Sequence, residues 1–460
     1  MFRKTISILI LITILLTSFS AITVNAETDL TTKLKENLIP LKTTQAENGF
    51  EDLMPFKEIL KDKKIIAMGE ATHGTKEFFE MKHRMFEFLV EEMGYRVFAI
   101  EAEFGGSQIV NDYILHGKGS IGESLDAMNF WIWNTQEVVD MIEWMKEYNE
   151  KPENKSKIRF YGFDIQSIDN DKEYIKDYLE KVNLPSKDSF KDDNSSLEDI
   201  NNDLIENKSV YIERSSLEEY DLILQHMVLI NQYNDFHNEN AESKNAGFEI
   251  RDDYMTENVK WILDYESKYY GNDKIMLWAH NGHVSKDYYG LKTIGRNLKD
   301  IYGGEYYAMG VDFYEGSFVA LPITFYGRVL AKLSKFHISS SPTDSYSNEM
   351  RKTNIPISFL DVKSAEQDKL LLDFLSSQLY VNNVTAAYPG KPHNMNETIV
   401  KDSFDGMIFV ESTEEAKRAD NYTDKVENGK GVLMGHYFSM IISLGTICIV
   451  SYHLYKRKSK

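Results

Sequence analysis

Cysteine is almost absent from this chain of 460 residues. The one cysteine, Cys448, lies in an apolar segment close to the C-terminus. An intramolecular disulfide is therefore excluded, and the fold has to depend on a large apolar core rather than on covalent links. A cysteine nucleophile in the main part of the chain is excluded as well.

Basic residues are scarce relative to acidic ones. Lysine and arginine number 52 against 72 aspartate and glutamate residues, which gives a formal net charge of −20 at pH 7. An acidic exterior opposes binding to a nucleic-acid backbone, so no nucleic-acid partner is expected. It favours a cationic substrate only weakly, because many acidic surfaces serve solubility alone.

Several motifs of familiar chemistry are also missing. The sequence has no Gly-x-Ser-x-Gly nucleophile elbow, no dinucleotide-binding fingerprint, no phosphate-binding loop and no internal repeat. Without a serine elbow or a usable cysteine, an acyl-enzyme mechanism is disfavoured. Direct attack by water is the simpler prediction for a hydrolytic site.

What the sequence does contain is a charged turn after a buried strand. Residues 64–68 are short, apolar and rich in β-branched side chains, as in a strand covered on both faces. Residues 69–74 read Gly-Glu-Ala-Thr-His-Gly, and apolar residues then recur at helical spacing from 75 to 90. Because catalytic groups collect at the carboxyl ends of strands in open α/β sheets, Glu70 and His73 are predicted to belong to a site.

A second turn has the same character. Residues 274–279 form another apolar run, and His-Asn-Gly-His follows at residues 280–283. A histidine at the end of a single strand is usually structural, but three of the eleven histidines lie in these two turns. The two turns together favour one site that combines Glu70 and His73 with His280 and His283.

Acidic residues follow other predicted strands. Glu101 and Glu103 come after residues 96–100, Asp164 comes after residues 158–163, and Asp312 comes after residues 306–311. Helix N-capping explains any one of these acids taken alone. Glu101 is the best functional candidate among them, because it follows its strand directly and a nearby Gly-Gly pair allows close approach of the backbone.

The order of the predicted elements indicates an α/β fold. Apolar, strand-like runs near residues 64, 96, 158, 274, 306, 318 and 406 alternate with helical stretches. We expect a central, mostly parallel sheet flanked by helices. A polar and helical insertion over about residues 186–265 is expected to form a wall or lid of the cleft at the strand ends.

Together these segments resemble the erythromycin esterase-like hydrolases, a family also labelled succinoglycan-biosynthesis-like. The resemblance rests on the turn at residues 69–75, the helix after it through residue 84, and the strand and acid at residues 98–101. Further similar segments are residues 133–138, 161–164, 251–255, 279–286 and 404–409. They occur in the family's order and span about residues 40 to 415.

The resemblance implies hydrolysis by water without a covalent intermediate. In that family a histidine matching His73 acts as general base on water, and a glutamate matching Glu70 orients or polarises it. Histidines matching His280 and His283 line the same cleft. The chemistry is sensible, because a neutral imidazole can accept a proton near pH 7 and a carboxylate can fix its tautomer.

The resemblance also implies that a basic residue on the first helix helps to bind the carbonyl oxygen. Macrolide esterases can carry arginine where this chain has Lys82, with Arg84 two residues on. Lysine lacks the planar fork of a guanidinium, so macrolide specificity does not transfer directly. The expected substrate is a small-molecule ester or lactone, macrolide-like compounds included, and no obligate protein partner is evident. The predicted substrate-binding residues are Glu101, Lys82, Arg84, Asp164, Lys286 and Arg251.

Two other functions would use the same residues. Glu70, His73, His280 and His283 provide one carboxylate and three imidazoles, which suits zinc, manganese or iron, although neither turn is the His-Glu-x-x-His helix of zincins. No cofactor is expected to be required. The first alternative is a metal-dependent hydrolase of a peptide or cell-envelope component, and the second is a surface binding protein without turnover.

Both ends of the chain predict export and anchoring. Residues 1–26 read as a secretory signal peptide, with an uncleaved N-terminal anchor as the alternative. Residues 437–454 contain no Asp, Glu, Lys or Arg and precede a basic tail at residues 455–460, which predicts a transmembrane helix. A polar spacer at residues 412–436 would join it to a hydrolase domain at residues 27–411. The expected location is the outer face of the cytoplasmic membrane of a Gram-positive bacterium.

Overall fold

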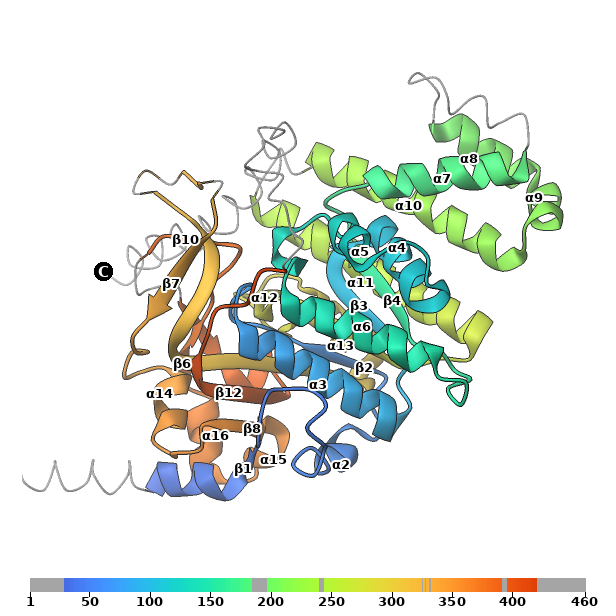
Figure 1. The fold of residues 1–460 in the computed structure, drawn as a ribbon. Coiled ribbons are helices and arrows are strands. Elements are labelled where there is room, and N and C mark those ends of the chain that lie inside the picture. Colours follow the sequence, from blue (N-terminus) through green and yellow to red (C-terminus); the bar gives the residue numbers. More distant parts are fainter. Residues whose placement is uncertain are drawn as a thin grey trace, which may run out of the picture.

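A long central sheet organises the molecule (Figure 1). The computed structural model describes residues 29–183, 197–239, 244–324, 326, 328–330, 332–390 and 395–419. In the described part the strand order across the sheet is β1-β8-β12-β6-β2-β5-β3-β4, with β7 and β10 also paired to β6 and a separate β9–β11 pair. The strands are β1 Leu38–Pro40, β2 Ile65–Met68, β3 Val97–Glu103, β4 Arg159–Asp164, β5 Ile275–Trp278, β6 Tyr306–Pro322, β7 Ser334–Ile338, β8 Ile357–Asp361, β9 Gln378–Asn382, β10 Ala387–Tyr388, β11 Met395–Ile399 and β12 Gly406–Thr413.

The middle of the sheet is parallel. Each neighbouring pair from β12 through β6, β2, β5 and β3 to β4 runs in the same direction. The antiparallel pairs are β8 with β12, β1 with β8, and β7 with β6. The predicted α/β class with a mostly parallel central sheet is therefore confirmed.

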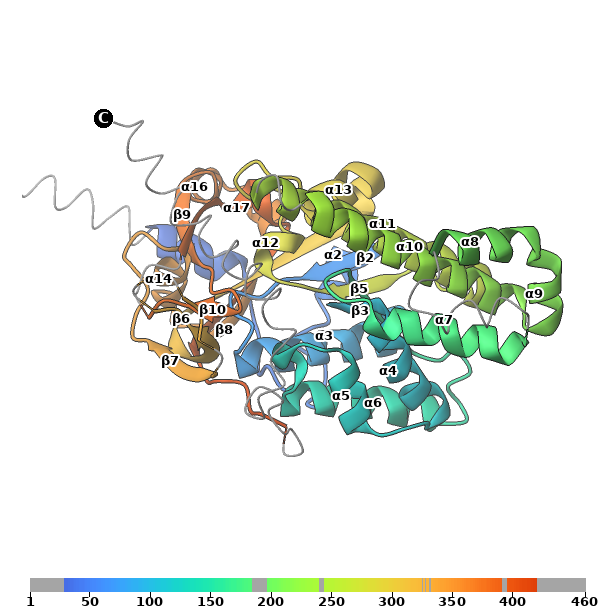
Figure 2. The same cartoon turned by 90° about the horizontal axis from the view of Figure 1, so that it is seen from above.

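Alternation of side chains along the strands divides the core into two apolar layers. In β2, Ile66 and Met68 belong to one layer, whereas Ile65 and Ala67 belong to the other. Helices cover both faces of the sheet, as Figure 2 shows from above. The first layer is covered by α3 Lys76–Met93, α4 Phe104–His116 and α6 Gln136–Glu150, and the second by α11 Lys244–Tyr270 and α13 Ile294–Tyr302.

Part of the predicted insertion, together with the helix that precedes it, forms a helical extension with a small core of its own. Its helices pack around a separate apolar cluster and project beyond the sheet (Figure 2). They are α7 Asp169–Val182, α8 Leu197–Glu206, α9 Lys208–Arg214 and α10 Leu217–Glu239. The remaining helices named here are α2 Phe56–Leu60, α5 Ile121–Ala127, α12 Asn281–Val284, α14 Tyr346–Arg351, α15 Val362–Ala365, α16 Lys369–Leu375 and α17 Val400–Ser403.

One long strand replaces the two strands predicted near residues 306 and 318. β6 continues through both regions and pairs with β12 as far as Gly316 opposite Thr413. Gly316 has a φ of 145°, and a Cβ there would lie 2.1 Å from Thr413 Oγ1. Glycine thus lets the strand change conformation without ending, which a pattern of apolar residues does not reveal.

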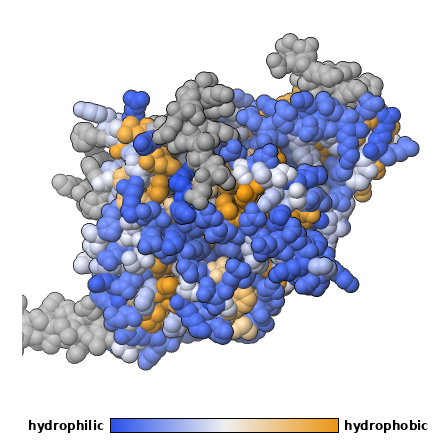
Figure 3. All heavy atoms as spheres, viewed as in Figure 1, coloured by the Kyte–Doolittle hydropathy of each residue, from blue (hydrophilic) through white to orange (hydrophobic). Residues whose placement is uncertain are grey.

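The predicted location at a membrane is corrected by the structure. Within the described ranges, no helix is long and apolar enough to cross a bilayer, so the structure gives no support for a single-pass C-terminal anchor. The predicted anchor at residues 437–454 and the predicted signal peptide at residues 1–26 lie outside those ranges. The face shown in Figure 3 is mostly hydrophilic with scattered apolar patches.

Close packing of β3 against β4 leads to a first prediction. A Cβ at Gly162 of β4 would lie 2.4 Å from the carbonyl oxygens of Ala102 and Glu103, where the register of the two strands shifts. Gly162→Ala should therefore lower the free energy of unfolding by about 1–3 kcal/mol in urea denaturation. Gly122→Ala in α5 is the matched control, because its nearest neighbour would be 4.0 Å away, and it should not destabilise. Equal stability of the two variants would contradict this packing.

Candidate active site

Polar side chains from four parallel strands meet at one edge of the sheet. β2 leads into Glu70 and His73, β3 carries Glu101, β4 ends at Asp164, and β5 leads into the turn at residues 280–283. These strands are neighbours in the order β2, β5, β3, β4, so their carboxyl ends lie next to each other. The hydrogen bonds described below connect the side chains into two adjoining clusters.

Glu70 is the centre of the first cluster. It is fully buried, and three donors from three different elements reach its carboxylate. His73 Nδ1 lies 2.6 Å from Oε1, whereas Lys82 Nζ of α3 and Trp278 Nε1 of β5 lie 2.9 Å and 2.7 Å from Oε2. A buried carboxylate with this many donors is stable as an anion.

The electrostatics of Glu70 agree with an ionised side chain. Burial alone raises the pKa of Glu70, but the charge of Lys82 and the hydrogen bond with His73 outweigh it, so the pKa lies below its usual value. Burial lowers the pKa of Lys82, and the carboxylate of Glu70 opposes that change. Ion pairing in the core therefore keeps both charges compatible with burial.

Lys82 was predicted to bind a substrate carbonyl, which stays a prediction, and the structure shows its amine paired with Glu70. Its side chain has no exposed area, and its Nζ lies 4.7 Å from the centre of the Trp278 ring. Lys82 is therefore buried against Glu70 and Trp278. Its contacts support the carboxylate rather than a bound ligand.

His73 has one ring nitrogen in use and one available. Its Nδ1 pairs with anionic Glu70, which requires the proton on Nδ1. No hydrogen bond from another described residue reaches Nε2, and the side chain keeps 9% of its area exposed. Nε2 is therefore able to accept a proton from a bound molecule.

His280 lies beside His73 but has the opposite tautomer. The two ring centres are 5.0 Å apart. His280 Nδ1 accepts a hydrogen bond from the backbone N–H of Gly282 at 3.2 Å, which leaves the ring proton on Nε2. Burial, with a smaller contribution from His73, lowers the pKa of His280 to about 3. A neutral ring therefore carries a buried Nε2–H that no described residue accepts.

His283 belongs to the second cluster, and both of its ring nitrogens are occupied. Nδ1 lies 2.8 Å from Asp252 Oδ1, and Nε2 lies 3.1 Å from Arg251 Nη1 and 3.3 Å from Glu101 Oε1. Burial lowers the pKa of His283, but the carboxylates of Asp252 and Glu101 outweigh it and raise the pKa above its usual value. Phe248 stacks on the ring with 5.1 Å between centres. His283 has no free nitrogen with which to act as a base.

Arg251 of α11 joins the ends of β3 and β4. Its Nε and Nη2 donate to both oxygens of Asp164 at 2.9 Å and 2.7 Å, and Nη2 also donates to Glu101 Oε1 at 2.8 Å. Glu101 Oε2 accepts from the backbone N–H of His280 at 3.0 Å. Burial raises the pKa of Glu101, but His283 and Arg251 outweigh it and hold the pKa well below its usual range. The amino-terminal part of α11 is thus the part of the predicted insertion that forms a wall of the site.

Two predicted substrate-binding residues lie outside both clusters. Arg84 is bound by Asp52, with its Nη2 2.5 Å from Oδ1, and Lys286 Nζ lies 2.7 Å from Asp405 Oδ1. Arg84 is two residues after Lys82 on one helix, and such positions do not face the same side. The structure therefore does not bring Arg84 or Lys286 into either cluster, and substrate binding by them stays a prediction.

Two residues of the clusters were not predicted from the sequence as site residues. Asp252 orients His283, and Trp278 donates to Glu70. Asp252 directly follows Arg251 in the sequence, and this neighbour was the one feature that could have pointed to Asp252 as a site residue. Trp278 ends an apolar strand, so its pattern indicated only a core residue.

The turn that carries His73 is held on two sides. The carbonyl oxygen of Gly74 accepts from the backbone N–H of Val319 at 3.1 Å and of Ala416 at 2.9 Å. A Cβ at Gly74 would lie 2.0 Å from the carbonyl oxygen of Val319. The chain after β12 therefore closes over the back of the turn and fixes its position.

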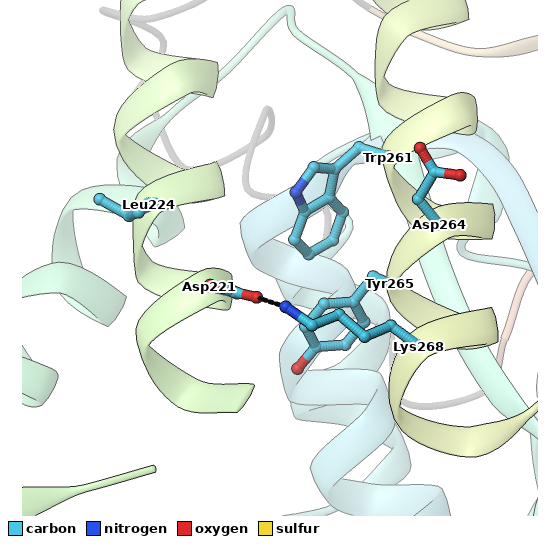
Figure 4. Close-up of a pocket in the computed structure, with 6 residues that line it drawn as sticks. All are labelled: Asp221, Leu224, Trp261, Asp264, Tyr265 and Lys268. Atoms are coloured by element: carbon cyan, nitrogen blue, oxygen red, sulfur yellow. Dashed lines mark hydrogen bonds and ion pairs between the residues drawn. The ribbon is translucent and has the colours of Figure 1, made fainter. Parts of the chain in front are cut away.

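A cavity of about 270 Å³ lies between α10 and α11, away from these clusters (Figure 4). Trp261 and Tyr265 project into it from α11, with their rings stacked at 4.6 Å. Asp221 of α10 is paired with Lys268 across the gap at 2.5 Å. No residue of the two clusters lines this cavity.

The possible metal ligands do not form a ready site. Among the residues that the structure describes, no three His, Cys, Asp or Glu side chains are grouped so that they could hold a metal ion. The four predicted ligands are divided between the two clusters, and Glu70 already has Lys82 as its cation.

The buried neutral state of His280 predicts a loss of stability in acid. The unfolded chain binds a proton on His280 below about pH 6.5, whereas the folded protein resists it until about pH 3, so this residue lowers the unfolding free energy as the pH falls through that window. His280→Asn should lessen the fall measured by urea denaturation between pH 7 and pH 5. Exposed His337→Asn is the control and should keep the wild-type slope. NMR signals of His280 that titrate near pH 6.5 would contradict the prediction.

The chain is similar in sequence to a protein-family model and to known proteins. The family model for erythromycin esterase matches residues 90–413, beginning after the turn with Glu70 and His73. Erythromycin esterase type II of Escherichia coli is 26% identical over 335 residues, which cover 63% of this chain and 78% of that protein. "Putative hydrolase YbfO" of Bacillus subtilis (strain 168) is 27% identical over 421 residues, covering 81% and 88%.

Solved structures share the fold. A crystal structure of a Bacillus cereus protein aligns with a TM-score of 0.71 at 25% identity, covering 85% of this chain and 99% of that one. An erythromycin esterase mutant, EreC, in its open conformation aligns with a TM-score of 0.61 at 14% identity, covering 83% and 99%, a likeness of fold alone. The resemblance found in the sequence is confirmed: the chain belongs to the erythromycin esterase family, and its relatives support a hydrolase.

Proposed function

We propose that the protein hydrolyses a carboxylic ester or lactone by direct attack of a water molecule. The observation that carries this proposal is the difference between the three histidines. His73 alone combines a carboxylate on Nδ1 with an available Nε2, whereas His280 presents an N–H and His283 has both nitrogens engaged. One base and one neutral donor side by side suit attack on a carbonyl group.

In the first step, His73 Nε2 accepts a proton from water while the water oxygen attacks the carbonyl carbon. The C=O bond becomes a C–O⁻ bond, and the imidazolium that forms is stabilised by Glu70 through Nδ1–H. The Nε2–H of His280 is the proposed donor to the new oxyanion, since the hydrogen-bonding capacity of this buried group is otherwise unused.

In the second step the tetrahedral intermediate collapses. The bond to the alkoxy oxygen breaks, and the proton on His73 Nε2 passes to that oxygen, which leaves as an alcohol. The products are a carboxylic acid and an alcohol, or one hydroxy acid from a lactone. His73 returns to its starting tautomer, so no group on the protein is consumed.

The second cluster has a structural role in this proposal. Arg251, Glu101 and Asp164 satisfy one another, so they fix α11 against the strand ends and hold the backbone of His280 through Glu101. Substrate binding by these three residues stays a prediction. Macrolide lactones are among the substrates to test, because one relative is named Erythromycin esterase type II.

A panel of esters, lactones and macrolides tests the function with purified protein. His73→Ala should lower kcat/KM by about 10²–10⁴-fold for any substrate that is turned over, because it removes the general base. His337→Ala, at an exposed position on β7, is the control and should keep wild-type activity.

The same panel separates the proposal from the two alternative functions when wild-type protein is also treated with a chelator and tested for ligand binding. Activity that survives chelation agrees with the proposal, whereas loss on chelation and rescue by one metal would replace it with a metal-dependent hydrolysis. Ligand binding without turnover by any member of the panel would favour a binding protein of the same fold.

A further inference from the structure

We propose that Trp278 is a positioning residue that sets the basicity of the Glu70–His73 pair through its indole N–H. This inference rests on the proposed function, in which His73 is the base. Trp278 touches neither His73 nor a substrate in this account. It acts on His73 through Glu70.

The geometry gives Trp278 a dedicated contact. It is the last residue of β5, is 1% exposed, and donates from Nε1 to Glu70 Oε2 at 2.7 Å. Lys82 donates to the same oxygen at 2.9 Å, and His73 has Oε1 to itself. Two donors therefore hold one oxygen, and the other is left to orient the base.

The ring of Trp278 is held by other aromatic side chains. Phe79, Phe98 and Trp133 surround it at centre-to-centre distances of 4.8 Å, 6.3 Å and 5.3 Å, each at a steep angle. Such edge-to-face packing fixes both rotatable bonds of the side chain. The direction of the N–H is therefore set before a substrate arrives, which is what a group that positions a catalytic carboxylate requires.

The chemistry of an indole suits this contact. An indole N–H donates but cannot accept, and it does not titrate over the range of protein stability. It stabilises the anion of Glu70 without adding a charge to the core, whereas a second lysine would have to be desolvated. By drawing charge toward Oε2, it weakens the pull of Oε1 on the His73 proton.

Trp133 provides a matched control from the same aromatic group. It is fully buried and packs against Trp278, but no described residue accepts a hydrogen bond from its Nε1. Replacing either tryptophan with phenylalanine removes the same atoms from neighbouring places. Only the Trp278→Phe change removes a donor from Glu70.

NMR of the full-length protein without substrate tests the inference. In Trp278→Phe the ring signals of His73 should titrate at a pH higher by about 0.5 unit than in wild type, because Glu70 regains electron density. Trp133→Phe should leave that midpoint in place. An unchanged midpoint in Trp278→Phe, or an equal shift in both variants, would overturn the inference.

A measurement on the wild-type protein covers the case in which Trp278→Phe does not fold. The indole N–H signal of Trp278 should move as His73 titrates, whereas the signal of Trp133 should not. A Trp278 signal that is insensitive to this titration would overturn the inference. Neither measurement needs turnover, so a failure of the proposed esterase activity would be distinguishable from a failure of this inference.

Where a substrate is found, kinetics give a further readout. Trp278→Phe should lower kcat about tenfold with little change in KM, and should move the acid limb of the kcat/KM profile to higher pH. A purely structural role would instead lower the amount of active enzyme and leave the pH profile in place.

Discussion

A single buried carboxylate, Glu70, is the constraint on which the rest of the candidate site depends. A carboxylate removed from water is tolerated only if its charge is matched and its lone pairs are used. Here the matching groups come from the turn after β2, from α3 and from β5, so the first cluster is complete only when all three are packed together. The same contacts that make the anion stable also fix the tautomer of His73.

The second cluster follows the same rule. Asp164 and Glu101 share Arg251, and Asp252 is matched by His283. Every acid at this edge of the sheet that we assign to a cluster thus has a cationic or proton-donating partner. This arrangement lets a strongly acidic chain collect carboxylates at the ends of its parallel strands without mutual repulsion.

The sequence was sufficient for the parts of the structure that depend on local pattern. β2, β3, β4 and β5 are short apolar runs ending in polar residues, so both the strands and the side chains at their ends could be predicted. Contacts made across the fold could not. Apolar periodicity assigns Trp278 to the core without showing that its N–H reaches Glu70, and neighbouring basic residues of α3 gave no sign of which one faces the site.

The same limit explains why two strands were predicted in place of β6 and why Asp252 of α11 was not predicted as a site residue. Conformation at Gly316 decides whether one strand or two form there, and that depends on its close contact with Thr413. Asp252 lies on a helix far along the chain from the turn that it supports. Only the three-dimensional packing of the helical insertion brings it to His283.

The most direct test of the account is the tautomer of His73, observed by nitrogen-15 NMR of the histidine-labelled protein at pH 8. The account predicts a protonated Nδ1 and a bare Nε2 on His73, together with the reverse arrangement on His280. A His73 ring with its proton on Nε2 would contradict it, because Glu70 would then not be orienting a base toward a substrate.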